Sequence, residues 1–153
     1  MTSPVIVRVG RRESFNAAHQ LYDPGLSDAE NRRLFGKCAN LHGHNYVLEV
    51  VVAGRVDQSS GYVLDLKVLS DVVCRQVIQD VDHRNLNTDV PWLNGRVPTA
   101  ENLAEAFWER LRAALPAGAP SLRRGRRSGG RRLTSRTATY SADETRPRIG
   151  YRS

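Results

Sequence analysis

The sequence lacks long apolar runs and contains few cysteines. Its apolar stretches are only a few residues long, whereas a membrane-spanning helix needs about 20. The beginning of the chain also lacks the long apolar segment and small-residue cleavage site of a secretory signal. Because only Cys38 and Cys74 are present, a disulfide framework is disfavoured. We therefore expect a cytoplasmic protein without a membrane segment.

Excess positive charge is absent from most of the chain, although 23 basic and 16 acidic residues give a net charge of +7. Residues 1–116 carry 13 basic and 14 acidic side chains (13 − 14 = −1), while residues 117–153 carry 10 arginines and two acidic residues (10 − 2 = +8). Clustered basic residues favour phosphate-bearing partners. Since the charge lies in the C-terminal segment alone, a nucleic-acid-binding protein is the weaker alternative.

The apolar pattern before residue 66 predicts strands. Alternation over residues 5–9 indicates one strand, which residues 15–19 extend or follow, and β-branched residues over 44–53 indicate a second. We expect the second strand to form a hairpin with residues 61–64 through a polar turn. A short capped helix is predicted within residues 23–35.

Two amphipathic helices follow. Apolar residues recur every three or four positions over 68–81, and a second such face begins after Thr99, a suitable N-cap, and ends at Pro116. The β-β-α-α order predicts an α+β domain over residues 1–116 and calls for further strands after it. Those strands are hard to identify, because residues 120–132 are rich in arginine, glycine and serine; a short strand-like segment covers 137–140.

The motif His42-Gly-His44 is the strongest local indication of chemistry. Side chains two apart on a strand point the same way, so these imidazoles can bind one metal ion. Of the remaining histidines, His19 is the best placed third ligand. Three histidines with an open position are typical of catalytic zinc sites. The alternative is that the motif is a polar turn entering a strand.

Three further positions are candidates for proton transfer. A nearby metal would lower the pKa of the Cys38 thiol, whereas a buried structural cysteine is the alternative and the better interpretation of Cys74. Asp82 could orient His83, although adjacent side chains often point apart. Glu101 is explained as a residue in the first turn of a helix.

Taken together, five sequence blocks resemble the 6-pyruvoyltetrahydropterin and 6-carboxytetrahydropterin synthase family in order and spacing. The blocks are F-N-A-A-H (15–19), L-F-G-K-C-A-N-L-H-G-H-N-Y (34–46), G-Y-V-L-D-L-K-V-L (61–69), D-H-R-N-L-N (82–87) and P-T-A-E-N (98–102). The resemblance covers about residues 5–115. It implies the tunnelling fold, a four-stranded antiparallel sheet with two helices on one face, assembled as trimers that stack into hexamers.

The resemblance also implies roles for individual residues. His19, His42 and His44 would hold Zn²⁺, and Cys38, Asp82 and His83 would move protons. Thr99 and Glu101 would line the pterin pocket at a subunit interface. The implied substrate is 7,8-dihydroneopterin triphosphate.

Two activities share this machinery. The carboxy enzyme cleaves the side chain and releases acetaldehyde on the way to queuosine, whereas the pyruvoyl enzyme eliminates triphosphate and keeps the side chain. The Cys-x-x-x-His-Gly-His spacing from Cys38 resembles the carboxy enzymes, and residues 34–37 and 44–46 resemble the pyruvoyl enzymes. We expect the carboxy activity, with the pyruvoyl activity as the alternative.

The resemblance fails after Pro116. The family continues with a strand, a Glu-Thr pair that anchors the pterin, and a final strand, but arginine-rich sequence occupies this region. Glu144-Thr145 follows Tyr140 instead of preceding it, so we assign it no role. Residues 117–153 are therefore expected to be disordered or the product of a reading-frame shift, which the coding DNA would test. A third hypothesis is an inactive zinc- or pterin-binding remnant.

Overall fold

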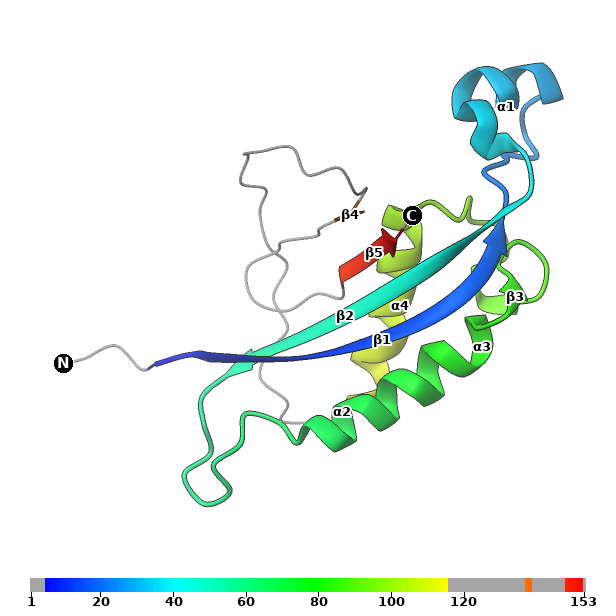
Figure 1. The fold of residues 1–153 in the computed structure, drawn as a ribbon. Helices are drawn as coiled ribbons and strands as arrows, with labels where there is room; N and C mark the ends of the chain where they lie inside the picture. Colours follow the sequence, from blue (N-terminus) through cyan, green and yellow to red (C-terminus); the bar gives the residue numbers. More distant parts are fainter. Residues whose placement is uncertain (1–4, 116–136, 139–147, 153) are drawn as a thin grey trace.

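Two long strands form the centre of the fold. The computed structural model describes residues 5–115, 137–138 and 148–152 (Figure 1). Strands β1 (Val7–His19) and β2 (His42–Gly54) pair antiparallel over the full 13 residues of each. The two short segments predicted before residue 20 are therefore one continuous strand.

The sheet is mixed, with the strand order β3-β1-β2-β5-β4. Strand β3 (Arg84–Asn85) runs parallel to β1, whereas β5 (Arg148–Arg152) pairs antiparallel with β2, and β4 (Thr137–Ala138) pairs antiparallel with β5. The α+β class is confirmed, but the purely antiparallel four-stranded sheet is not, because the chain after the first long helical segment returns alongside β1 in the same direction. The rest of segment 117–153 lies outside the described residues, so its predicted disorder or frame shift stays a prediction.

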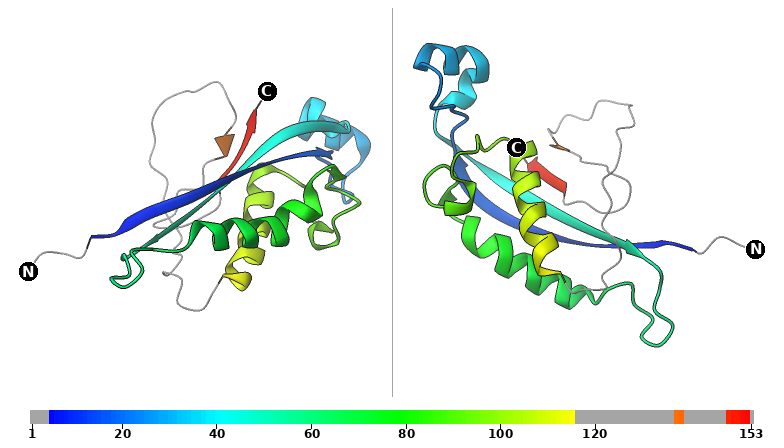
Figure 2. Two further views of the ribbon diagram at one scale, coloured as in Figure 1. Left: turned by 60° about the horizontal axis from the view of Figure 1, so that its bottom comes forward. Right: turned by 180° about the vertical axis from the view of Figure 1, so that it is seen from behind.

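The helical layer covers one face of the sheet, as Figures 1 and 2 show. It consists of α2 (Leu66–Val73), a π-helix (Cys74–Ile78), α3 (Gln79–Val81) and α4 (Ala100–Ala114). The core between the layers is apolar and fully buried, and its largest members are Phe15, Tyr46, Leu48, Leu69, Leu86, Leu103, Phe107 and Leu111. Both predicted helices are present.

The predicted hairpin between β2 and residues 61–64 is wrong. Instead, the backbone N–H of Asp57 donates to the carbonyl of Tyr62 at 2.8 Å, and the Asp57 carboxylate accepts hydrogen bonds from Ser59 and Ser60. This closed turn leads directly into α2, so the partners of β2 are β1 and β5.

The segment between β1 and β2, residues 20–41, projects beyond the end of the sheet (Figure 1). It contains α1 (Asp28–Phe35), with the predicted capping box of Ser27 and Glu30, and the 3₁₀-helix Gly36–Ala39. The backbone N–H of Leu21 donates to the carbonyl of Cys38 at 2.8 Å, which joins the two ends of this segment. A second 3₁₀-helix (Pro91–Leu93) lies between β3 and α4. Every helix among the described residues is too short or too polar to cross a lipid bilayer.

Candidate metal centre and active site

The pairing of β1 with β2 brings three histidines together at one end of the sheet. His19 lies opposite His42, and His44 lies opposite Ala17, so all three side chains share the face that carries the buried Phe15 and Tyr46. One ring nitrogen from each histidine lies within 4.8 Å of the others. These residues could hold a metal ion, as the sequence predicted.

Backbone carbonyls fix two of the three rings. Nδ1 of His19 donates to the carbonyl of Pro98 at 2.8 Å, and Nδ1 of His42 donates to the carbonyl of Asn40 at 2.7 Å. The Nε2 atoms of His19 and His42 then carry the lone pairs and lie 3.1 Å apart. Metal-binding histidines commonly donate their other N–H to a carbonyl in this way. Two lone pairs aimed into one small volume repel unless a cation lies between them, so this donor set fits a metal ion.

The environment of His19 and His44 favours their neutral form. The pKa of His19 is lowered from 6.5 to about 4, mainly by burial; the hydrogen bond to Pro98 opposes this shift, and the neighbouring His42 and His44 add to it. Burial and then His42 also lower the pKa of His44. Neutral imidazole is the form that binds metals, so the lowered pKa values of His19 and His44 favour metal binding at neutral pH.

The lowered pKa of His19 predicts that acid destabilises the metal-free protein. His19 takes up a proton near pH 6.5 in the unfolded chain but only near pH 4 in the folded chain. Its contribution to the free energy of unfolding is therefore fully present above pH 6.5 and is lost as the pH falls toward 4. We expect a loss of about 2.5 kcal/mol between pH 7.5 and 4.5 from this group. Urea unfolding of the metal-free protein and of His19→Gln at both pH values measures it; an equal acid sensitivity of the two proteins would contradict the prediction.

Asp82 and His83 form a contact pair, a point that the sequence left open. Nδ1 of His83 lies 3.0 Å from Oδ2 of Asp82. The pair is held against β1, because the backbone N–H of Asn16 donates to Asp82 at 2.8 Å and the carbonyl of Asn16 accepts from the N–H of His83 at 2.6 Å. The Asn16 hydrogen bond, followed by those with His83, lowers the pKa of Asp82 despite partial desolvation. His83 adopts a φ of 56°, a strained value for a residue with a side chain and one that occurs often at functional sites.

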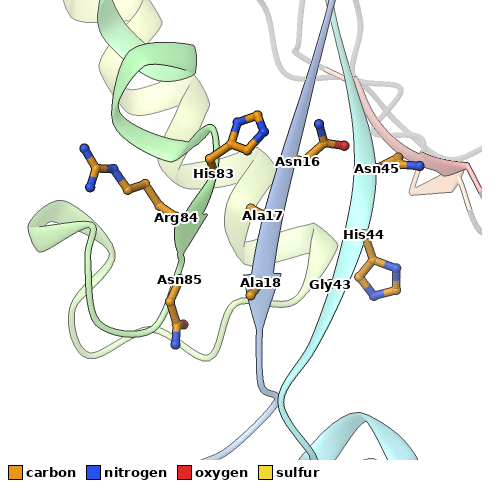
Figure 3. Close-up of a pocket in the computed structure, with 9 residues that line it drawn as sticks. All are labelled: Asn16, Ala17, Ala18, Gly43, His44, Asn45, His83, Arg84 and Asn85. Atoms are coloured by element: carbon orange, nitrogen blue, oxygen red, sulfur yellow. The ribbon is translucent and has the colours of Figure 1, made fainter.

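A pocket of about 600 Å³ lies where β3, β1 and β2 meet (Figure 3). It is lined by His83 on one side and His44 on the other, with small residues of β1 and β2 between them. Within the described part of the chain, no hydrogen bond or ring contact joins the Asp82–His83 pair to the three histidines. The pocket is thus lined by one residue of the candidate metal centre, His44, and by one residue of the dyad, His83.

The other predicted site residues are Cys38, Thr99 and Glu101. Cys38 is half-buried in the 3₁₀-helix before β2, four residues before His42. Thr99 caps α4 by accepting from the N–H of Asn102, and it directly follows Pro98, which holds His19. Glu101 is exposed in the first turn of α4. The catalytic and binding roles of these residues stay predictions.

Sequence reasoning missed the groups that orient the site. The carbonyls of Pro98 and Asn40 fix the metal-site histidines, and the backbone of Asn16 fixes the dyad. A carbonyl acceptor has no residue-type pattern that could reveal it. Only the helix start at Thr99 hinted that the chain turns near Pro98.

An α+β sheet with three histidines that could hold a metal ion is compatible with a class of metal-binding enzymes, and comparison with known proteins identifies the family. The family model for 6-pyruvoyl tetrahydropterin synthase matches residues 8–127. The human 6-pyruvoyl tetrahydrobiopterin synthase is 45% identical over 113 residues, covering 72% of this chain and 78% of the human one. The solved 6-pyruvoyl tetrahydropterin synthase of Caenorhabditis elegans is 42% identical with a TM-score of 0.73, covering 80% of this chain and 89% of that one.

The chain therefore belongs to the 6-pyruvoyl tetrahydropterin synthase family, a family of enzymes. A more distant relative, 38% identical over 109 residues and covering 71% of this chain and 78% of its own length, is the dihydroneopterin monophosphate aldolase of Pyrococcus furiosus. The expected carboxy activity of the queuosine pathway is wrong, because relatives 40–46% identical to this chain are named 6-pyruvoyl tetrahydrobiopterin synthase. The cysteine spacing misled because it does not determine which substrate bond breaks.

Proposed function

We propose that the protein is a zinc-dependent 6-pyruvoyl tetrahydropterin synthase, a lyase that converts 7,8-dihydroneopterin triphosphate into 6-pyruvoyltetrahydropterin and triphosphate. The observation that carries the proposal is the cluster of three histidines, with ring nitrogens within 4.8 Å of one another, in a chain of this family. The names of its relatives support the pterin substrate and the pyruvoyl product.

His19, His42 and His44 would hold the zinc ion. An all-imidazole donor set suits Zn²⁺, and three protein ligands leave a position for substrate oxygens. When bound, zinc would act as a Lewis acid that polarises the side-chain hydroxyls of the substrate and acidifies the adjacent C–H bonds. The hydrogen bonds from His19 to Pro98 and from His42 to Asn40 keep Nε2 of both rings available for the ion.

The remaining residues would bind the substrate and move its protons. The Cys38 thiolate accepts a proton from the substrate side chain, and His83 returns a proton through Nε2, because Asp82 holds its Nδ1. Thr99 and Glu101 contribute to the pterin pocket. By resemblance to the family, the protein works in the cytoplasm as a homo-oligomer in which the pocket lies between subunits.

Release of triphosphate tests the proposal. Purified protein incubated with dihydroneopterin triphosphate is expected to release triphosphate, to stop when a chelator removes the metal, and to recover when zinc is added back. Release that continues undiminished in the metal-free protein would contradict the zinc requirement. Metal binding without any release would instead support the inactive remnant.

A further inference from the structure

The ring of Tyr46 contacts two histidines of the candidate metal centre, His19 and His44. It lies on the same face of β2 as His44, two residues further along, and is completely buried. Its centroid is 5.7 Å from that of His44 and 6.1 Å from that of His19, with interplanar angles of 80° and 85°. These are edge-to-face contacts, which restrict the rotation of both imidazoles.

Tyr46 is itself fixed from β1 and α4. Its ring stacks on Phe15, its partner in the β1–β2 register, with centroids 4.7 Å apart and planes within 2°. Phe15 in turn contacts Phe107 of α4 edge to face at 6.0 Å, and Phe107 contacts Trp92 at 5.7 Å. His19 and His44 thus contact an aromatic cluster whose position is determined by the packing of the helices on the sheet.

This packing supplies a constraint that the carbonyl hydrogen bonds do not. A single hydrogen bond from Nδ1 of His19 to Pro98 fixes the direction of one nitrogen but leaves the plane of the ring free to tilt. A metal site needs the lone pair of each ligand nitrogen aimed at one point, and groups outside the ligand set commonly provide that aim. The contacts of Tyr46 with His19 and His44 meet this need for two ligands at once.

We infer that Tyr46, supported by Phe15, is a positioning residue for the metal centre: its ring sets the orientation of His19 and His44. The inference rests on the proposed function for the identity of the metal. It does not depend on the product or on turnover, because the orientation of the ligands can be measured without substrate.

The test compares Tyr46→Phe, which keeps the ring, with Tyr46→Leu, which removes it. The probes are the visible absorption of the Co²⁺-loaded protein, which reports ligand geometry, and the zinc affinity measured by competition with a chelator. We expect Tyr46→Phe to match the wild type and Tyr46→Leu to shift the Co²⁺ bands and weaken zinc binding about tenfold or more. Should Tyr46→Leu fail to fold, Phe15→Leu, which removes only the stacking partner, is expected to shift the same bands.

Leu48→Ala is the matched control, because Leu48 is equally buried on the same face of β2, two residues further from the histidines. It should lower the midpoint of urea unfolding and leave the Co²⁺ spectrum unchanged. The inference is overturned if Tyr46→Leu keeps the wild-type spectrum and affinity, if Leu48→Ala shifts the spectrum as much, or if the wild type binds neither metal. If the wild type shows no turnover while the expected spectra and zinc affinities are observed, only the proposed function is contradicted.

Discussion

Replacing Cys38 by alanine is expected to abolish turnover while leaving the zinc content unchanged. In the proposed reaction its thiolate is the base, and removal of such a group typically costs about 10²–10⁴-fold in rate. The metal should stay, because the group of residues that could hold it consists of the three histidines, and Cys38 lies outside that group, in the preceding 3₁₀-helix. Triphosphate release and zinc per chain, measured on the same preparation, check both parts.

Cys74→Ala provides the matched control for this experiment. Cys74 is also half-buried and unpaired with another cysteine, but it begins the π-helix that follows α2. We expect this variant to remain active. A Cys38→Ala protein with wild-type activity would remove Cys38 from the mechanism, and an inactive Cys74→Ala protein would show that loss of either thiol acts through folding.

Replacing His19 by alanine is expected to remove the metal and the activity together. His19 is the most buried of the three histidines, with 2% of its surface exposed, and it is the ligand held by Pro98. With two imidazoles left, we expect the zinc affinity to fall by more than about 100-fold, a larger loss than orienting groups alone cause. Zinc per chain after equilibration with a chelator measures the effect.

His83→Ala separates the metal centre from the dyad. His83 is exposed, bonds Asp82, and makes no ring contact with the three histidines among the described residues. This variant should therefore retain zinc and lose turnover. Zinc retained at wild-type affinity by His19→Ala would contradict the assignment of the metal centre.

The periodic segments could be predicted from the sequence, whereas long-range pairing could not. The β-branched run of β2 and the apolar faces of α2 and α4 are local patterns that predict a strand and two helices. The hairpin prediction for residues 61–64 failed because the Asp57 turn satisfies its own hydrogen bonds and redirects the chain into α2. Strand β3 was missed because two residues paired in parallel with β1 carry no alternation that a sequence could show.

The candidate site was predictable in its residue types and not in its arrangement. His42 and His44 share a face through strand geometry alone, but His19 is 23 positions before His42 and joins them only through the β1–β2 register. The orienting carbonyls of Pro98 and Asn40 depend on tertiary structure and were invisible. The choice between two products was also beyond the local pattern, because it depends on which substrate bond breaks after the shared proton transfers.

The excess positive charge of the chain lies in the C-terminal segment, residues 117–153, and not among the predicted site residues. The described part of that segment includes β5, which pairs with residues 45–49 of β2, directly after the histidine motif. The sequence after Pro116 therefore contributes a strand to the sheet that carries the site, and the nucleic-acid alternative stays untested.

Identification of the pterin product is the most direct test of the central claim. Zinc-loaded protein is incubated with 7,8-dihydroneopterin triphosphate, and the product is identified by mass spectrometry while acetaldehyde is assayed in the same reaction. The proposed function predicts a tetrahydropterin that keeps all the side-chain carbons as a pyruvoyl group, with triphosphate and no acetaldehyde. A 6-carboxy pterin accompanied by an equal amount of acetaldehyde would contradict it.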